Sequence, residues 1–342
     1  GGKPMKCLLM RRAMMLTTAA LLIGSPVRAN DSEAEIGIGG IELKSSAVRL
    51  DSEDLYISEA RVTVDYRFTN PTEDDVTATV AFPMPLQPRG MGDQYMYLDG
   101  IEPWNGFGFA TYVDGAPVRL QQVDRAVIGG EDVTERIEAL GWPLYWFRDE
   151  AFLEQRRGMS QDASVNPYAV EGLLTEDELY PGELIPAWDV ATYFVRDQFF
   201  PAGETVAVRH EYVPVAGGSV GGALAPAVRT EMPEIMTEYR DRWCVDNAFL
   251  AGLDKRLAAS DPNEPWGVYG ETWLSYVLSS GSNWSGPIGK FRLVVDKGSP
   301  DNLVSFCMDG VSKISPTAFE VQKTNFEPAR DLDILILKFW DE

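Results

Sequence analysis

Apolar and polar residues alternate along two neighbouring segments of this chain, and this pattern most constrains how it can fold. Every second residue is apolar in segment 62–68, and the same spacing recurs in segment 76–82. A period of two places alternate side chains on opposite faces of an extended strand. The residues Asn70-Pro71-Thr72 between the two segments predict a turn. We therefore expect an antiparallel hairpin with one buried face.

Strand patterns continue through most of the chain, whereas long amphipathic helices are rare. Asp114-Gly115 predicts a tight hairpin turn between two further strands. The chain is therefore expected to be mainly β, built as antiparallel β-sandwich-like units with short helical insertions. The further strands, each bounded by Gly, Pro or Asp-Gly turn signals, are expected at 107–113, 118–127, 190–200, 206–213, 272–278, 289–295, 303–307, 318–322 and 334–339.

Segment 132–186 interrupts the strand pattern with helix-start signals and many aromatic residues. Trp142 and Trp146 lie within it, and Trp104 precedes it. These three rings are candidates for lining a binding surface. Clusters of this kind more often anchor an irregular segment to the core, and that interpretation is the better supported one.

The glycine-rich run 216–223 is the best place to divide the chain. We expect an N-terminal β domain over 30–215, which contains the insertion, and a C-terminal β unit over 216–342 packed on it. One helix is expected in the second unit, over 246–259, because four apolar residues share one helical face there.

The N-terminal segment 1–29 has the pattern of a signal peptide: basic residues, then an apolar run too short to span a bilayer, then small residues. We expect cleavage between Ala29 and Asn30, which would leave no transmembrane segment and a periplasmic or secreted protein. Residues 1–4 precede the first methionine and are interpreted as a cloning or reading-frame remnant. The pair Arg11-Arg12 leaves general secretion and twin-arginine export both open.

Export would make an acidic chain more acidic. Segment 1–29 carries five basic residues and no acidic one, so its removal changes the formal net charge from −22 to −27. Such a chain repels phosphate backbones, and nucleic acid is not an expected partner. Calcium is the candidate ion, at the oxygen-rich segments 51–54 and 73–75. Neither has the spacing of a calcium loop, so solvated turns are the simpler interpretation.

Three residues bear on covalent or metal chemistry after the signal segment. Cys244 and Cys307 are the two remaining cysteines, and in an oxidising compartment they are expected to form a disulfide, with two buried thiols as the alternative. His210 is the single histidine of the chain, and it lies within an expected strand. A structural role, in which His210 donates to a neighbouring carboxylate, is therefore favoured over that of a catalytic base.

Several phrases of the mature chain resemble the bacterial secreted family called domain of unknown function 4424. The resemblance implies an exported protein of bacterial envelopes, and it implies no reaction, so no catalytic residue is carried over. The phrases lie at 52–58 with 64–70, at 80–85, at 210–215, and at 315–321 with 331–335.

The leading hypothesis is a non-catalytic binding or assembly module of the envelope, whose partner is an envelope protein or a glycan. No cofactor is expected besides the calcium considered above. One alternative is a glycan hydrolase that uses a pair of carboxylates, prompted by the many acidic residues and by Trp104, Trp142 and Trp188. The other is a calcium-stabilised carbohydrate-binding module. The sequence does not indicate the oligomeric state.

Overall fold

The computed structural model describes residues 32–37, 40–44, 47–84, 108–177, 180–214, 216–220, 222–258, 269–278 and 284–340. The expected signal peptide, its cleavage site at Ala29 and Asn30, and Trp104 lie outside these residues and stay predictions. The described chain is mainly β with a few short helices, as predicted. Within the described ranges, no helix is both long enough and apolar enough to span a membrane.

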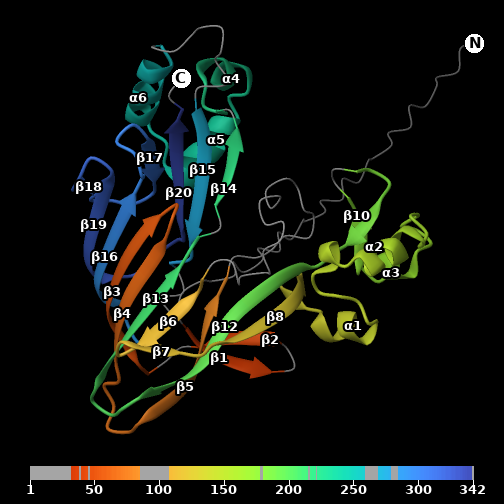
Figure 1. The fold of residues 1–342 in the computed structure, drawn as a ribbon, viewed down its shortest axis with the longest axis horizontal. Helices are drawn as coiled ribbons and strands as arrows, with labels where there is room; N and C mark the ends of the chain where they lie inside the picture. Colours follow the sequence, from red (N-terminus) through yellow and green to blue (C-terminus); the bar gives the residue numbers. More distant parts are fainter. Residues whose placement is uncertain are drawn as a thin grey trace, which may run out of the picture.

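An eight-stranded sheet forms one layer of the molecule (Figure 1). All neighbours in it are antiparallel except β3 and β16, which run parallel and join residues from the two expected domains in one sheet. The strands in spatial order are β18 (Ser312–Lys313), β19 (Ala318–Phe326), β16 (Ile288–Asp296), β3 (Arg49–Ser58), β4 (Val62–Thr69), β13 (Thr205–Tyr212), β6 (Ala110–Val113) and β7 (Ala116–Val118).

Two smaller sheets pack against this layer. Their apolar residues share one buried cluster with the inner face of the eight-stranded sheet, which makes the arrangement sandwich-like. The six-stranded sheet has the order β2 (Gly40–Lys44), β1 (Ser32–Gly37), β5 (Val76–Pro83), β12 (Asp189–Phe200), β8 (Gln121–Ile128) and β9 (Glu131–Asp132). The four-stranded sheet has the order β14 (Gly217–Val220), β15 (Tyr269–Tyr276), β20 (Leu332–Phe339) and β17 (Leu303–Phe306).

The hairpin predicted from segments 62–68 and 76–82 does not form. β4 pairs with β3 and β13, whereas β5 pairs with β1 and β12 in the other sheet. The apolar faces of both strands are buried in the same cluster, so they meet face to face across the sandwich rather than edge to edge. The turn at Asp114-Gly115 is confirmed, since both residues have positive φ and β6 pairs with β7. The strand expected at 118–127 is not its partner, because most of that segment is β8, which pairs with β12 in the six-stranded sheet.

A third layer of helices covers the other face of the four-stranded sheet (Figure 1). Strand β20 is consequently buried on both faces: Ile334 and Ile336 face the sandwich core, and Leu335 and Leu337 face the helices. The helix expected over 246–259 is α6, and two further helices precede it. The helices are α4 (Pro226–Glu231), α5 (Ile235–Trp243) and α6 (Asn247–Leu257).

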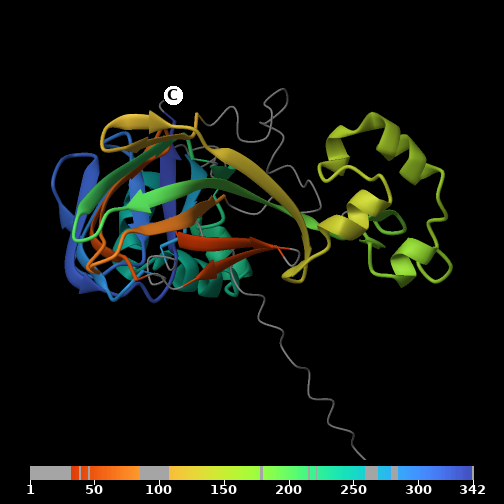
Figure 2. The ribbon, with the colours of Figure 1, turned by 90° about the horizontal axis from the view of Figure 1, so that it is seen from below.

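The helical insertion projects from the end of the ribbon formed by β8 and β12 (Figure 2). It has an apolar cluster of its own, which includes Trp142, Trp146 and Trp188 and reaches the sheet at Ala126 and Val190. Its elements are α1 (Thr134–Ala139), the short helix η3 (Trp146–Arg148), α2 (Glu150–Arg157), α3 (Pro167–Val170), β10 (Leu174–Glu176) and β11 (Leu184–Pro186).

Candidate functional site

The outer face of the eight-stranded sheet carries a row of charged side chains. In the strands that form it, the apolar residues point into the sandwich, so the polar residues between them point to the solvent. Arg292, Asp54, Asp65 and Arg209 occupy directly opposite positions on four adjacent strands, β16, β3, β4 and β13. We call these four residues the charged row.

Each arginine of the charged row bridges two carboxylates. Arg209 Nη1 lies 2.7 Å from Asp65 Oδ2, and Arg209 Nε lies 2.6 Å from Glu211 Oε1. The guanidinium of Arg209 is the donor in both hydrogen bonds. The hydrogen bond to Glu211 raises the pKa of Arg209 above its ordinary value. The cation therefore stays charged at any physiological pH, and its fork geometry fixes the side chain.

Arg292 repeats this arrangement at the other end of the row. Its Nη1 lies 2.9 Å from Asp54 Oδ1, and its Nε lies 2.7 Å from Glu320 Oε1. Asp54 and Asp65 face each other across β3 and β4, a pairing of like charges that is unfavourable by itself. The two flanking arginines offset this repulsion and hold the row in order. The four residues of the row have a formal charge of zero, and with Glu211 and Glu320 the cluster has a formal charge of −2.

A shallow concavity of about 680 Å³ lies over the middle of this face. Arg67 borders it and is exposed, and among the described residues its side chain makes no hydrogen bond or ion pair. Lys290 lies two strands away, opposite Ser52 of β3, and it likewise has no partner within the described chain. The residues that line the concavity are Ser52, Asp54, Asp65, Tyr66, Arg67, Tyr112, Gly115, Ala207, Val208, Arg209 and Glu211.

Two carboxylates are buried in the described part of the chain, Glu53 and Glu271. Glu53 lies in the sandwich core, where the Tyr276 hydroxyl lies 3.4 Å from its Oε1. Glu271 lies on β15, on the face opposite to that of Tyr276, and it accepts hydrogen bonds from Tyr239 in helix α5, at 2.6 Å, and from Trp273, at 3.0 Å. Desolvation raises the pKa of Glu271. The four-stranded sheet thus separates the two carboxylates, so they do not face one common groove.

His210 is fully buried on β13, and its Nδ1 lies 2.7 Å from the Thr111 hydroxyl. Aromatic rings surround it, among them Phe82 and Phe109. The burial is that of a structural side chain, but the Nδ1 contact is with a hydroxyl, whereas a carboxylate was expected.

The aromatic residues singled out in the insertion are buried in its core. Trp142 is 5% exposed and Trp146 is 7% exposed. The Trp142 ring contacts Phe152, Tyr168 and Trp188. The rings thus pack against one another inside the insertion, and their cluster reaches the sheet at Ala126 and Val190.

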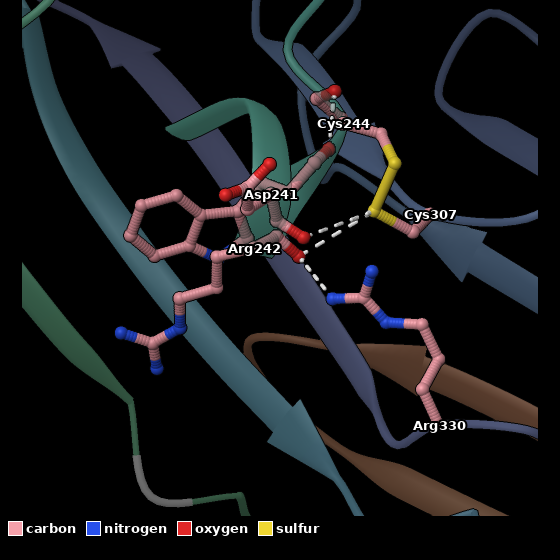
Figure 3. The surroundings of a disulfide bond; sticks show 7 residues. Asp241, Arg242, Cys244, Cys307 and Arg330 are labelled. Atoms are coloured by element: carbon pink, nitrogen blue, oxygen red, sulfur yellow. Dashed lines mark hydrogen bonds between the residues drawn. A yellow bond between two sulfur atoms is a disulfide. The ribbon is translucent and has the colours of Figure 1, made fainter. Parts of the chain in front are cut away.

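The structure joins Cys244 and Cys307 by a disulfide (Figure 3). Cys244 ends helix α5 in the left-handed region, with φ of 55°, and its N–H donates to the carbonyl of Arg240. The Sγ of Cys307 lies 3.5 Å from the carbonyl oxygen of Arg242; this is a contact only, because a disulfide sulfur has no proton to donate. Arg330 donates to the same carbonyl at 3.0 Å.

The two segments considered for calcium form folded surface structure. In segment 73–75 the carbonyl of Asp74 accepts from Asn70 Nδ2 at 2.8 Å, and Asp75 Oδ1 accepts from the N–H of Ala202 at 2.9 Å. In segment 51–54, Asp51 pairs with Arg49 and Asp54 pairs with Arg292. Across the described residues, no group of three or more His, Cys, Asp or Glu side chains is arranged to hold a metal ion.

The fold is that of a mainly β, sandwich-type protein, and the outer face of its eight-stranded sheet is open and charged. The chain belongs to the family Domain of unknown function (DUF4424), whose model matches residues 29–335. This match confirms the resemblance inferred from the sequence phrases. Among curated proteins, no sequence matches the chain.

Solved structures share distant likeness with the chain. One, from Legionella pneumophila subsp. pneumophila str. Philadelphia 1, bears the name "putative nutrient binding protein"; it has 14% identity and a TM-score of 0.41, with 91% of this chain and 72% of that chain covered. An M1 zinc metallopeptidase from Deinococcus radiodurans has 11% identity and a TM-score of 0.24, with 86% of this chain and 43% of that chain covered. At these values neither likeness carries a function to this chain.

Proposed function

We propose that this protein is exported to the bacterial envelope and acts there as a non-catalytic binding protein. Its binding surface is the outer face of the eight-stranded sheet, and its partner is another envelope protein. The observation that carries the proposal is the charged row, Arg292, Asp54, Asp65 and Arg209, which is held by ion pairs beside a 680 Å³ concavity. The signal peptide pattern of residues 1–29 supports export.

The ion pairs order this face before any partner arrives. A side chain that is already fixed loses less conformational entropy on binding, so more of the contact energy appears as affinity. A charged, patterned surface also favours the correct partner and orientation over others. The charged row therefore suits recognition of a folded protein surface better than attack on a bond.

The positions of Arg67 and Lys290 indicate which charged groups the partner should carry on its contact surface. They have no ionic partner among the described residues, and β3 lies between their strands, so their strands are about 10 Å apart at the usual spacing. A partner with two carboxylates at that separation would complete both pairs. Charge complementarity of this kind acts mainly on the association rate and on specificity.

The position of the buried carboxylates speaks against the hydrolase alternative. A glycosidase needs two carboxyl groups that flank one glycosidic bond. Glu53 and Glu271 lie on opposite sides of the four-stranded sheet, whereas Asp54 and Asp65 are exposed and each is paired with an arginine. Glu53 and Glu271 therefore cannot flank one bond, and Asp54 and Asp65 already serve as ion-pair partners of Arg292 and Arg209.

The test compares two double variants in native envelopes. Arg67→Glu with Lys290→Glu reverses the free cations of the face, and Arg157→Glu with Lys255→Glu reverses two exposed cations on helices α2 and α6. After mild crosslinking and capture, we expect one partner protein to be retained by the wild type and the control and lost by the face variant. Melting temperatures verify that all three proteins are folded.

Two outcomes would overturn the proposal. The first is a set of captured proteins that the face variant leaves unchanged. The second is recovery of a glycan in place of a protein, with the same dependence on Arg67 and Lys290, since that result would retain the surface and replace the class of partner.

A further inference from the structure

A second concavity lies at the edge of the sandwich, where the chain crosses from one sheet to the other. Strand β7 ends at Val118 in the eight-stranded sheet, and β8 begins at Gln121 in the six-stranded sheet. The cavity beside this crossover has a volume of about 470 Å³. Its lining residues are Thr79, Val113, Val118, Arg119, Leu120, Gln121, Val195, Arg196, Asp197 and Gln198.

The cavity exists because β12 is longer than one of its neighbours. β5 pairs with β12 as far as Phe200, whereas β8 pairs with it only as far as Val195. The stretch of β12 after Val195 therefore has no β8 residue beside it, and the crossover residues wall the opening instead. The carbonyl of Phe199 in this stretch accepts a hydrogen bond from the side-chain amide of Gln198, at 2.9 Å.

The charged side chains in the lining of this cavity are two arginines and one aspartate. Arg196 is only 8% exposed, and its Nε donates to Oε1 of Gln198, its neighbour on the same strand face, at 3.4 Å; Gln198 is 6% exposed. Arg119 is exposed, and it forms no hydrogen bond or ion pair with the described residues. Asp197 is the one carboxylate of the lining, and it accepts a hydrogen bond from Thr79 at 3.0 Å. The lining thus holds two guanidinium groups and one carboxylate, in a chain whose overall charge is strongly negative.

The remaining walls are apolar, since Val113, Val118, Leu120 and Val195 contribute them. Ligand sites for small molecules are commonly concave, lined mainly by apolar side chains, and oriented by a few polar groups. Arginine is the residue best suited to a planar oxyanion, because its fork of N–H donors matches a carboxylate in two bonds. The volume falls within the range of such sites.

We propose that this cavity is a binding site for a small carboxylate that has an apolar body. Arg119 and Arg196 hold the carboxylate, and the valine and leucine side chains contact the apolar part. This site is separate from the outer sheet face, so its occupancy does not depend on the protein partner proposed above.

The test titrates the full-length protein with hexanoate and with benzoate in an isothermal calorimeter, and with inorganic phosphate as the comparison. We expect saturable binding of at least one of the two carboxylates at millimolar concentration and no comparable binding of phosphate. Arg119→Gln removes a charge-assisted donor and should weaken binding by about 10-fold or more. Arg157→Gln changes an exposed arginine of helix α2 and should leave binding unchanged.

Arg196 is buried, so its substitution is designed to preserve the charge. Arg196→Lys keeps the cation and removes the two-pronged donor, and it should weaken binding while the melting temperature shows the fold intact. Absence of carboxylate binding by the wild type would overturn the proposal. So would binding that Arg119→Gln leaves unchanged, or phosphate binding as tight as that of both carboxylates.

Discussion

The disulfide is expected to supply a large part of the stability of the C-terminal layers. Cys244 and Cys307 are 63 residues apart, and closing a loop of that length stabilises the folded chain by about 4 kcal/mol on the chain-entropy model. The bond also joins the end of α5 to the residue after β17, so it ties the helical layer to the four-stranded sheet. The double variant Cys244→Ser with Cys307→Ser should lose most of that free energy of unfolding.

A second double variant separates the crosslink from the backbone conformation. Cys244 has a φ of 55°, and Val245 donates to the carbonyl of Tyr239, which together form a helix end that normally takes glycine. Glycine adopts positive φ without the steric cost that other residues incur. Cys244→Gly with Cys307→Ser should therefore be more stable than the double serine variant by about 1 kcal/mol.

Equilibrium unfolding in urea measures both effects, with wild-type protein in the presence and absence of reductant as the control. Reduced wild type and the double serine variant should unfold at similar urea concentrations. The reasoning is refuted if the double serine variant loses less than about 1 kcal/mol, because loop closure would then contribute little. Equal stability of the glycine and serine variants would refute the argument about the backbone.

Two further predictions concern buried side chains. Burial raises the pKa of Glu271 in the folded protein, so ionisation of this carboxyl group opposes folding. The stability that Glu271 contributes is fully present below its pKa in the unfolded chain, and it is lost as pH rises through its pKa in the folded protein. Glu271→Gln should flatten this pH dependence of the melting temperature, and an unchanged pH profile would count against the prediction. Trp188 is fully buried, and its indole N–H donates to the carbonyl of Leu144 at 2.9 Å. Trp188→Ala should lower the free energy of unfolding, measured by chemical denaturation, by about 3–5 kcal/mol. A loss near zero would show that the core of the insertion contributes little to stability.

Membership of the DUF4424 family places the chain among proteins defined by a shared sequence rather than by a reaction. Its candidate surfaces differ in kind. The outer sheet face is broad and carries paired charges, as a protein partner requires, whereas the crossover cavity is small and partly apolar, as a small molecule requires. Variants at Arg67 and at Arg119 test them separately.

Local patterns explain why much of the fold was predictable. Alternation along single strands depends only on which side chains face the solvent, so the strands at 190–200, 206–213 and 289–295 reappear as β12, β13 and β16. The disulfide was predictable because two cysteines remain after the expected signal segment. Family membership was predictable from short phrases that keep their order along the chain.

Strand partners were not predictable by the same means. Alternation indicates which face of β4 and of β5 is apolar. It does not indicate whether the two strands pair within one sheet or pack against each other across a core from different sheets. The charged row was not predictable for the same reason. The alternation places Asp65 on the solvent face of its strand, but its neighbours Asp54 and Arg209 come from other strands, whose pairing with β4 the sequence does not indicate. The crossover cavity likewise depends on where β8 stops along β12.

Residue identity and local spacing are enough to infer the strand content, the pair of cysteines, the acidic charge and the family of this protein. Tertiary structure alone decided the partners of each strand, the layers and both candidate surfaces. Strand pairing and layer packing depend on the free energy gained when apolar faces from distant segments are buried together, and this free energy cannot be read from any one segment.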